Sequence, residues 1–373
     1  MNTQRKAESM KVCEKLDRRE LQAALGICGR VTPRRPIQDV LAFVKLEPGA
    51  IEANDGELRV KVASTYQGET ILLPFNKLAE LTRLASGETF ELETTKAKAI
   101  IKTDSGRWQL PTGEPQAWPQ VRNEKRQPVA RVAADQLARG IAAVIDATDQ
   151  SAGMVALGGV LIDVTDGLVT LVASDGRRLF THEIEIDQAV DDCQLLMTQR
   201  TATLVGVLAG QLSDEGEVQI ERTPGEIFFD IGGGAAAQVI ARQQTGNFPA
   251  WRKKIPGMGR ATPTTVRADK FCEAIKQAAI CSSEETRAVE LTLGEKIVAE
   301  ATSSEAGKSC VQLEPLEAGK AVKLRLNPQF CVEWLRRVDP AEPITIEAVD
   351  ASSAVVFRSE DSTGVVMPME ANA

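Results

Sequence analysis

Apolar side chains recur at helical spacing in three separated stretches of the chain. Residues 17–28, 133–146 and 268–281 each place apolar residues at positions i, i+3, i+4 and i+7, so each predicts a helix with one buried face. A short strand-like segment comes before each of them. Asp17 is the predicted N-cap of the first helix, and Glu20, three residues on, is the second half of a capping box.

A second type of helix also recurs three times. It follows an apolar strand and a turn residue, within residues 72–88, 196–211 and 325–339. After each of these helices, apolar and polar residues alternate in two runs that are separated by a turn. This pattern is typical of antiparallel strands with one buried face.

Further strands are predicted between the two helices of each unit. The first two units carry the turn sequences ANDG at 53–56 and ASDG at 173–176 in corresponding places. Each unit is predicted to end in a strand that closes on proline, at 116–120, 247–251 and 365–369.

These recurrences indicate an α+β fold built from tandem repeats. We infer three copies of a unit with two helices and an antiparallel sheet, at residues 10–125, 126–255 and 262–373. Chance similarity among α+β segments is the alternative, but two helix types, a central turn and a terminal proline recur in the same order. Helices that cover one side of a curved sheet can line a concave surface.

The composition is that of a globular protein, but the charge is not that of an ordinary DNA-binding protein. The chain has 373 residues, of which 43% are hydrophobic and 26% charged. It has no apolar run long enough for a membrane helix and no signal-like start, so we expect a cytoplasmic protein. The net charge is −8 and the pI is near 5.1, whereas a protein that holds DNA by charge alone is usually basic. Binding DNA would therefore require a local basic surface or another means of staying attached.

Residues that could carry catalysis are sparse. His182 is the only histidine, and Cys193 lies eleven residues after it in a strand and an acidic loop, which is a poor setting for a nucleophile pair. Cys272 and Cys281 are nine residues apart, which does not suit zinc. The glycine run at 231–238 is interpreted as a hairpin or connection, and no P-loop is present. We therefore expect no enzyme activity, no metal and no cofactor.

Three short runs carry a family resemblance. ASDGRRL at 173–179, FPAWRKKIP at 248–256 and VVMPM at 365–369 resemble the bacterial sliding clamp, the beta subunit of DNA polymerase III. The resemblance extends from about Met10 to Met369. It implies a head-to-tail homodimer that forms a ring of six units, with helices lining the hole and sheets on the outside. Duplex DNA would thread through the ring and be held topologically, with contacts to phosphates and no reading of base sequence.

The resemblance also implies a pocket for short peptide tails of DNA polymerase III, the clamp loader, other polymerases and repair proteins. The matching positions are Leu157, Ser174, Gly176, Arg177, Arg178, Leu179, Pro249, Val365, Val366, Met367, Pro368 and Met369. Apolar side chains would make a slot, the two methionines would let it repack for different ligands, and Arg177 and Arg178 could pair with groups of the tail. The same residues could equally be an edge strand and a hairpin turn.

This chain departs from the family pattern at several of these places. Lys253 replaces the usual arginine of the FPAW segment, and Lys254 stands at the apolar position after it. Val155 and Ala156 stand where aromatic residues can occur, and the chain continues past the last methionine as Glu370, Ala371, Asn372 and Ala373. These differences bear on which peptide binds and how tightly.

The resemblance also supplies candidates for DNA contact and for ring closure. The DNA-facing candidates are Arg30, Arg34, Arg35, Lys77, Arg83, Arg139 and Arg200. At the dimer interface we expect Ile280 and Cys281 to meet the first unit of the partner near Lys77. An ordinary solvated arginine and an intrachain core are the alternatives for these positions.

Two other functions stay open. The chain could be a divergent clamp paralogue with altered partner choice, or a small-molecule-binding or hydrolytic α+β protein that shares only the architecture. A dimer of twice 40.2 kDa would favour a clamp, and a monomer that turns over a substrate would favour the last alternative.

Overall fold

The computed structural model describes residues 13–94, 98–122, 124–149, 151, 154–186, 191–212, 216–232, 236–283 and 287–370. Ala371, Asn372 and Ala373, and residues 233–235 of the glycine run, lie outside this part. The described residues fall into two compact units, one within 1–128 and 216–242 and the other within 129–215 and 243–373.

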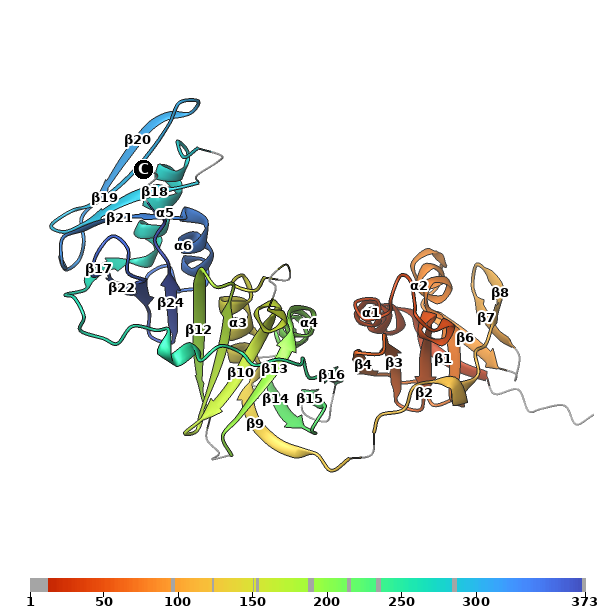
Figure 1. The fold of residues 1–373 in the computed structure, drawn as a ribbon. Helices are drawn as coiled ribbons and strands as arrows, with labels where there is room; N and C mark the ends of the chain where they lie inside the picture. The colour runs from red at the N-terminus through yellow and green to blue at the C-terminus, as the bar shows by residue number, and fades with distance from the viewer. Residues whose placement is uncertain are drawn as a thin grey trace, which may run out of the picture. The chain divides into compact units, whose positions relative to one another are not determined.

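The order of elements repeats three times, as the sequence predicted (Figure 1). Each copy has one strand, a helix, four strands, a second helix and three strands. The helices are α1 (Arg18–Cys28), α2 (Phe75–Leu84), α3 (Ala134–Ile145), α4 (Gln199–Ala209), α5 (Ala268–Ala279) and α6 (Pro328–Leu335). The α+β class and the tandem repeat are thereby confirmed, while the three residue boundaries stay a prediction.

The strands of the first compact unit form two antiparallel sheets. One has the order β1-β6-β7-β8, and the other runs β5-β2-β3-β4-β16-β15-β14. Their bounds are β1 Cys13–Asp17, β2 Phe43–Glu47, β3 Ala50–Asn54, β4 Leu58–Ala63, β5 Ile71–Pro74, β6 Thr89–Thr94, β7 Lys98–Thr103, β8 Gly106–Pro111, β14 Glu217–Arg222, β15 Glu226–Ile231 and β16 Ala237–Arg242. Helices α1 and α2 pack side by side, with α1 against β3 and β4 and α2 against β2 and β5.

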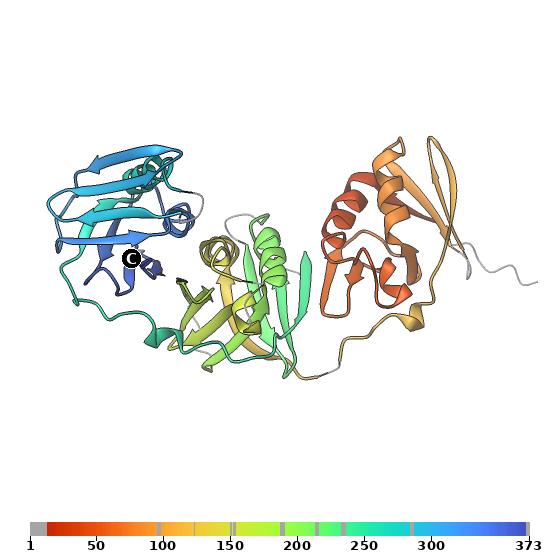
Figure 2. The same ribbon diagram turned by 45° about the horizontal axis from the view of Figure 1, so that its top comes forward.

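The second compact unit also has two antiparallel sheets. An eight-stranded sheet has the order β13-β10-β11-β12-β24-β23-β22-β17, and a four-stranded sheet has the order β20-β19-β18-β21. The bounds are β10 Gly159–Thr165, β11 Leu168–Ser174, β12 Arg178–Glu185, β13 Cys193–Thr198, β17 Thr264–Arg267, β18 Val289–Leu293, β19 Ile297–Ser303, β20 Gly307–Leu313, β21 Val322–Leu326, β22 Pro343–Glu347, β23 Val355–Arg358 and β24 Ser362–Val366. The unit also holds most of β9 (Gln127–Ala133). Helix α3 packs against α4 and β12, and α5 packs against α6 and covers β19 and β20 (Figure 2).

The pairing of β12 with β24 makes one sheet from segments that are far apart in the chain. The register runs from Arg178 opposite Val366 to His182 opposite Ser362. His182 is buried there, and its Nδ1 lies 2.8 Å from Ser362 Oγ. Strands β10 and β11 separate His182 on β12 from Cys193 on β13, which is about 14 Å at the usual strand spacing, so the two residues do not form a nucleophile pair.

Two local predictions are wrong. Residues 116–120 and 247–251 are not strands: residues Pro115–Ala117 and Trp251–Lys253 form single 3-10 turns, and only the last segment begins inside a strand, β24. At these two turns an indole N–H donates to a buried carboxylate, Trp118 to Glu52 and Trp251 to Asp163, which orients the segment away from an extended strand.

The capping box is only half formed. Asp17 accepts a hydrogen bond from the Glu20 amide at 2.8 Å, as predicted. Glu20 does not reach back to Asp17. Its carboxylate accepts from the Thr65 amide at 2.7 Å and from the Thr65 hydroxyl at 2.9 Å, so it ties α1 to the loop after β4.

None of the helices in the described part of the chain has the length and apolar character needed to cross a bilayer.

Candidate functional site

An apolar cluster lies on one face of the eight-stranded sheet. Because alternate residues of a strand share a face, Leu161 on β10 meets Val172 on β11 and Leu196 on β13, and Leu179 on β12 meets Val365 on β24. The buried members of this apolar cluster are Ala156, Leu161, Val172, Leu179, Leu196, Trp251, Val356 and Val365, and Phe248, Ile255 and Ala354 pack against it partly exposed.

A buried carboxylate fixes the indole of this cluster. Asp163 is 1% exposed, and its Oδ2 accepts from Trp251 Nε1 at 2.7 Å and from Gln194 Nε2 at 3.0 Å. Arg252 forms an ion pair with the same oxygen at 2.5 Å and lies over the Trp251 ring. The charge of Asp163 is thus matched inside the fold, and the segment from Phe248 is held against β10.

The turn between β11 and β12 is organised by its polar side chains. Ser174 Oγ donates to the Arg178 carbonyl at 2.7 Å, and Asp175 Oδ1 accepts from the amides of Arg177 and Arg178, each at 2.9 Å. Gly176 has a φ of 87°, a conformation that favours glycine. The ASDG sequence therefore sets where Leu179 enters the apolar cluster.

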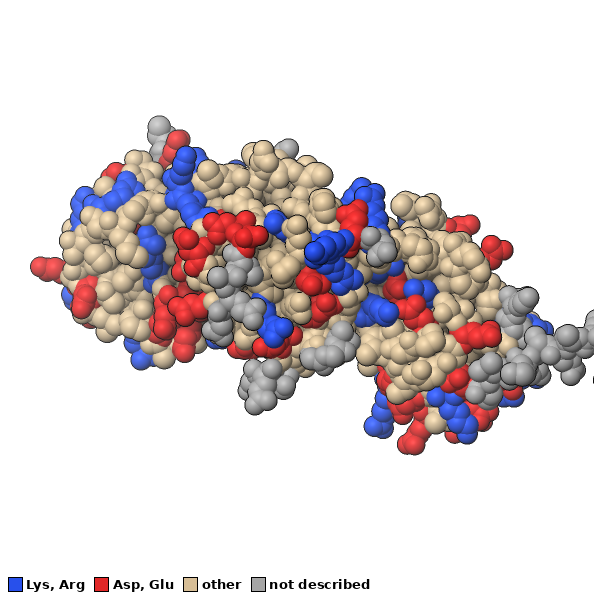
Figure 3. Space-filling view, turned by 90° about the horizontal axis from the view of Figure 1, so that it is seen from below, with Lys and Arg blue, Asp and Glu red and all other residues tan. Residues whose placement is uncertain are grey.

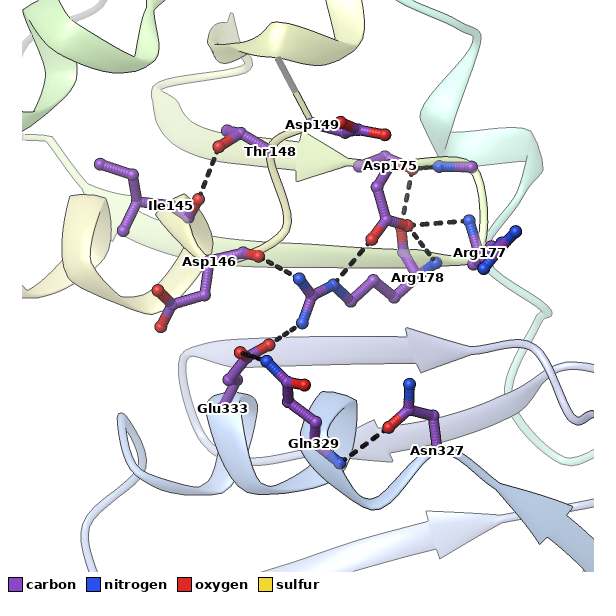
Figure 4. A network of polar contacts seen from close by, with 12 residues as sticks. Ile145, Asp146, Thr148, Asp149, Asp175, Arg177, Arg178, Asn327, Gln329 and Glu333 are labelled. Atoms are coloured by element: carbon purple, nitrogen blue, oxygen red, sulfur yellow. Dashed lines mark hydrogen bonds and ion pairs between the residues drawn. The ribbon is translucent and has the colours of Figure 1, made fainter. Parts of the chain in front are cut away.

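Arg178 is surrounded by partners from three elements (Figure 4). Its Nε donates to Asp175 Oδ2 at 3.0 Å, its Nη1 pairs with Glu333 of α6, and its Nη2 donates to the carbonyl of Asp146 at the end of α3. The side chain is 9% exposed, and Phe330 lies against the guanidinium with a centroid distance of 4.3 Å. Arg177, by contrast, points its side chain into an exposed position.

The C-terminal segment beside the cluster borders an open pocket. The amide of Met367 donates to the Arg177 carbonyl at 2.9 Å, and the amide of Met369 donates to the Arg325 carbonyl at 2.8 Å. Met367 is 45% exposed. The pocket has a volume of about 660 Å³ and is lined by Glu290, Lys323, Leu324, Arg325, Ala351, Ser352, Met367, Pro368, Met369 and Glu370.

The sequence-predicted pocket residues thus gather around two adjoining features. Leu157, Ser174, Leu179, Val365 and Val366 are buried, and Leu179 and Val365 belong to the apolar cluster itself. Met367, Pro368 and Met369 line the 660 Å³ pocket, and the half-buried Pro249 follows Phe248. Gly176 and Arg177 lie exposed at the turn.

Several site residues were missed by sequence reasoning. Asp163 could have been found, because it is the one charged residue in the otherwise apolar run GVLIDVT, and such a charge needs partners when it is buried. The sequence suggested that Lys254 replaces an apolar residue of this segment. Ile255, the next residue, packs against the apolar cluster and supplies an apolar contact there. Lys254 itself is exposed.

The predicted DNA-facing residues are all exposed. Arg30, Arg34 and Arg35 follow α1, Lys77 and Arg83 lie on α2, and Arg139 and Arg200 lie on α3 and α4. Arg139 pairs with Asp135 at 3.0 Å, and Lys77 lies 3.9 Å from Glu80. On the face seen in Figure 3, basic and acidic side chains lie among wide neutral areas.

The described residues offer little for catalysis. Nowhere among them do three or more His, Cys, Asp or Glu side chains gather to hold a metal ion. Burial raises the pKa of the Cys28 and Cys331 thiols to about 12, so both stay protonated and unreactive at neutral pH.

Comparison with known proteins agrees with this architecture. Residues 255–370 match the family model described as DNA polymerase III beta subunit, C-terminal domain. The beta sliding clamp of Synechococcus elongatus is 24% identical over 94% of this chain and 97% of its own length, and that of Pseudomonas aeruginosa is 24% identical over 94% and 96%. The crystal structure of the Pseudomonas aeruginosa clamp bound to griselimycin has a TM-score of 0.88 and 20% identity, and it covers 97% of this chain and all of the clamp.

The match of the C-terminal third, the relatives aligned over nearly the whole chain and the shared fold agree: this chain is similar along almost its full length to the bacterial beta sliding clamps, and its residues 255–370 match the C-terminal domain of the DNA polymerase III beta subunit.

Proposed function

We propose that this chain is a non-enzymatic processivity clamp of the cytoplasm. Two copies would close a ring around duplex DNA and tether DNA polymerase III and other DNA-processing proteins. The observation that carries the proposal is the apolar cluster with the exposed Met367 beside it, in a chain that shares the clamp fold from end to end.

The apolar cluster suits a short peptide tail better than a polar substrate. Its buried members are apolar apart from the indole N–H of Trp251, which is already bound to Asp163. An apolar tail residue packed beside Leu179 and Val365 would lose water without leaving a polar group unpaired. A clamp of this fold holds griselimycin, which supports ligand binding by the family. We assign this site to tails of DNA polymerase III, the clamp loader, other polymerases and repair proteins.

A topological hold on DNA resolves the conflict with the acidic composition. A net charge of −8 argues against tight binding by phosphate neutralisation, which a freely sliding ring does not need. The exposed arginines and lysines at positions 30, 34, 35, 77, 83, 139 and 200 would make transient phosphate contacts. Such contacts carry no base specificity, so the ring could slide over any sequence.

Ring closure would join the two free sheet edges of neighbouring chains. Strands β8 and β20 are the outer strands of their four-stranded sheets, so each has an unpaired edge among the described residues. Ile280 is 75% exposed, and Ser309 of β20 donates to the Ala278 carbonyl beside it at 2.7 Å. We propose that this corner of residues 262–373 meets residues 10–125 of the partner chain, with Cys281 and Lys77 nearby.

The sequence departures favour a second candidate, a divergent clamp with altered partner choice. Lys253 and Lys254 place two exposed cations beside the apolar cluster, and Glu370 lines the 660 Å³ pocket. Lys254 and Glu370 alter the charge that a peptide tail would meet, whereas Lys253 keeps the charge of arginine but not its planar fork of donors. Under this candidate the ring and its hold on DNA would be the same, and only the bound tails would differ.

The decisive experiment combines mass and topology. Sedimentation should give a dimer of twice 40.2 kDa. Chain loaded by the cognate clamp loader onto nicked circular DNA should stay bound at high salt and leave when the DNA is cut to a linear form. A monomer that leaves circular and linear DNA equally fast would refute the clamp, and turnover of a small substrate would favour the hydrolytic alternative.

A further inference from the structure

Arg178 stands out because a residue expected to meet the peptide already uses each of its three guanidinium nitrogens for a partner within the chain. All three guanidinium nitrogens have partners, namely Asp175, Glu333 and the Asp146 carbonyl. The side chain is 9% exposed and its planar face is covered by Phe330. A guanidinium whose charge is already matched by the carboxylates of Asp175 and Glu333 gains little by turning to a ligand.

The three partners come from three different elements. Asp175 belongs to the β11–β12 turn, and Glu333 belongs to α6 (Figure 4). Asp146 is the C-cap of α3, where unpaired carbonyls and the helix dipole favour a cation. Arg337 of α6 adds a second link, since its Nη2 donates to Asp146 Oδ2 at 3.2 Å.

These links lie directly behind the candidate peptide site. Leu179, the next residue after Arg178, belongs to the apolar cluster, and Arg178 pairs across the sheet with Val366. The next amide along, that of Met367, donates to the Arg177 carbonyl at 2.9 Å. Through Glu333, Arg178 therefore connects the wall made by β12 with α6, and α6 packs against β24, which makes the other wall.

We propose that Arg178 is a positioning residue, which with Glu333 holds these two walls at the spacing that a peptide tail requires, and which does not itself contact the tail. The proposal rests on the proposed function of the site. Apolar sites bind through close packing, so a small shift of one wall lowers affinity. Removing Arg178 would leave the Glu333 carboxylate, whose side chain is only 18% exposed, without its cation, and removing Glu333 would leave Asp175 as the one carboxylate of the described residues paired with the nearly buried Arg178.

The roles of contact and positioning predict opposite results at Glu333. The test measures binding of the C-terminal peptide of the cognate polymerase subunit to wild type, Arg178→Met, Glu333→Gln and the double variant Arg178→Met with Glu333→Leu. Positioning predicts that each single change weakens binding about tenfold, equivalent to about 1.4 kcal/mol, and that the double variant recovers much of it because an apolar pair can replace a buried ion pair. A direct contact predicts unchanged or tighter binding for Glu333→Gln and no recovery in the double variant, and either result would overturn the proposal.

A second readout does not depend on the peptide. Hydrogen exchange of the Met367 amide and of β24 should speed up in both single variants and return toward the wild-type rate in the double variant. Unchanged exchange in both single variants would overturn the positioning role of Arg178, whether or not the chain binds a tail. Failure of the wild-type chain to bind any tail would count against the proposed function instead. Glu314→Gln removes an exposed ion pair with Lys296, at 3.1 Å, and serves as the matched control that changes neither readout.

Discussion

Two tryptophans of this chain are held by buried carboxylates. Trp118 Nε1 donates to Glu52 Oε1 at 2.8 Å, and Trp251 Nε1 donates to Asp163 Oδ2 at 2.7 Å. Glu52 is further paired with Lys45 and Arg59, at 2.6 Å each. A carboxylate removed from water needs such partners, so in both compact units the acid, its cations and the indole form one structural unit.

We expect Asp163→Asn to weaken both folding and peptide binding. The neutral amide can no longer balance the charge of Arg252, and to keep its oxygen on the indole N–H it must place its NH2 group beside the Thr165 hydroxyl, which donates to Asp163 Oδ1 in the wild type. Loss of a buried charged hydrogen bond should lower the free energy of unfolding by about 1–3 kcal/mol. Urea unfolding followed by tryptophan fluorescence measures this. Glu52→Gln, the control in the other compact unit, should also destabilise but leave peptide affinity unchanged, and equal effects of the two variants on affinity would contradict the assignment.

Replacing Met367 and Met369 by alanine should weaken binding of the polymerase peptide and leave the dimer intact. Met367 is 45% exposed beside the apolar cluster, and both methionines line the 660 Å³ pocket. Their flexible side chains can follow the shape of a bound tail, which alanine cannot. Calorimetric titration should show a loss of tenfold or more. Met258→Ala, at a residue that is 79% exposed in the linker after Trp251, is the control; unchanged affinity in the double methionine variant would remove these residues from the site.

At the scale of elements, the junction of β12 and β24 carries the chain's only histidine. His182 packs so closely under α3 that a Cβ on Gly140 would lie 2.6 Å from its ring. Ser362 and Asp361 face it from β24 and the preceding turn, at 2.8 and 3.6 Å, and Arg139 adds a positive charge from α3. Burial lowers the pKa of His182, Asp361 opposes that shift, and Arg139 adds to it.

Stability should therefore fall in mild acid. The unfolded chain takes up a proton at His182 near pH 6.5, while the folded chain resists protonation until a lower pH. Between these two values the unfolded state binds more protons, so the free energy of unfolding decreases as the pH falls, by at most about 1.4 kcal/mol per pH unit for one group. Urea unfolding at pH 7.5, 6.5 and 5.5 measures the slope. His182→Gln should flatten it, and an equal slope in this variant would assign the effect to other groups.

The sequence predicted which helices form, but it did not predict which elements contact one another. Helices α1, α3 and α5 lie within the predicted stretches, because their apolar spacing is local information. The pairing of Arg178 with Val366 joins residues about half a chain apart. Alternation of apolar and polar residues shows which face of a strand is buried, but not which strand lies beside it. For the same reason the sequence suggested Arg178 as a peptide contact: the resemblance placed it in the turn, whereas Glu333 and Asp146 come close only in the folded chain.

For the whole molecule, unpaired sheet edges matter most. A strand edge with free backbone groups tends to pair with another chain unless it is covered or charged. Strands β8 and β20 each end a four-stranded sheet. Since β8 precedes residue 128 and β20 follows residue 243, the two edges belong to different compact units, and a head-to-tail contact between two copies would use both edges of each chain.

Ile280→Asp should therefore convert the dimer into a monomer without unfolding the chain. The side chain is 75% exposed in the single chain, so its charge costs little in folding, whereas burial of an unpaired carboxylate in an apolar interface is strongly unfavourable. Sedimentation should shift from twice 40.2 kDa to 40.2 kDa, with an unchanged thermal midpoint. Ile37→Asp, at a residue that is 84% exposed in the other compact unit, should keep the dimer. A dimer that survives Ile280→Asp would move the interface away from α5 and β20, whereas a monomer that also leaves circular DNA quickly would tie ring closure to the hold on DNA.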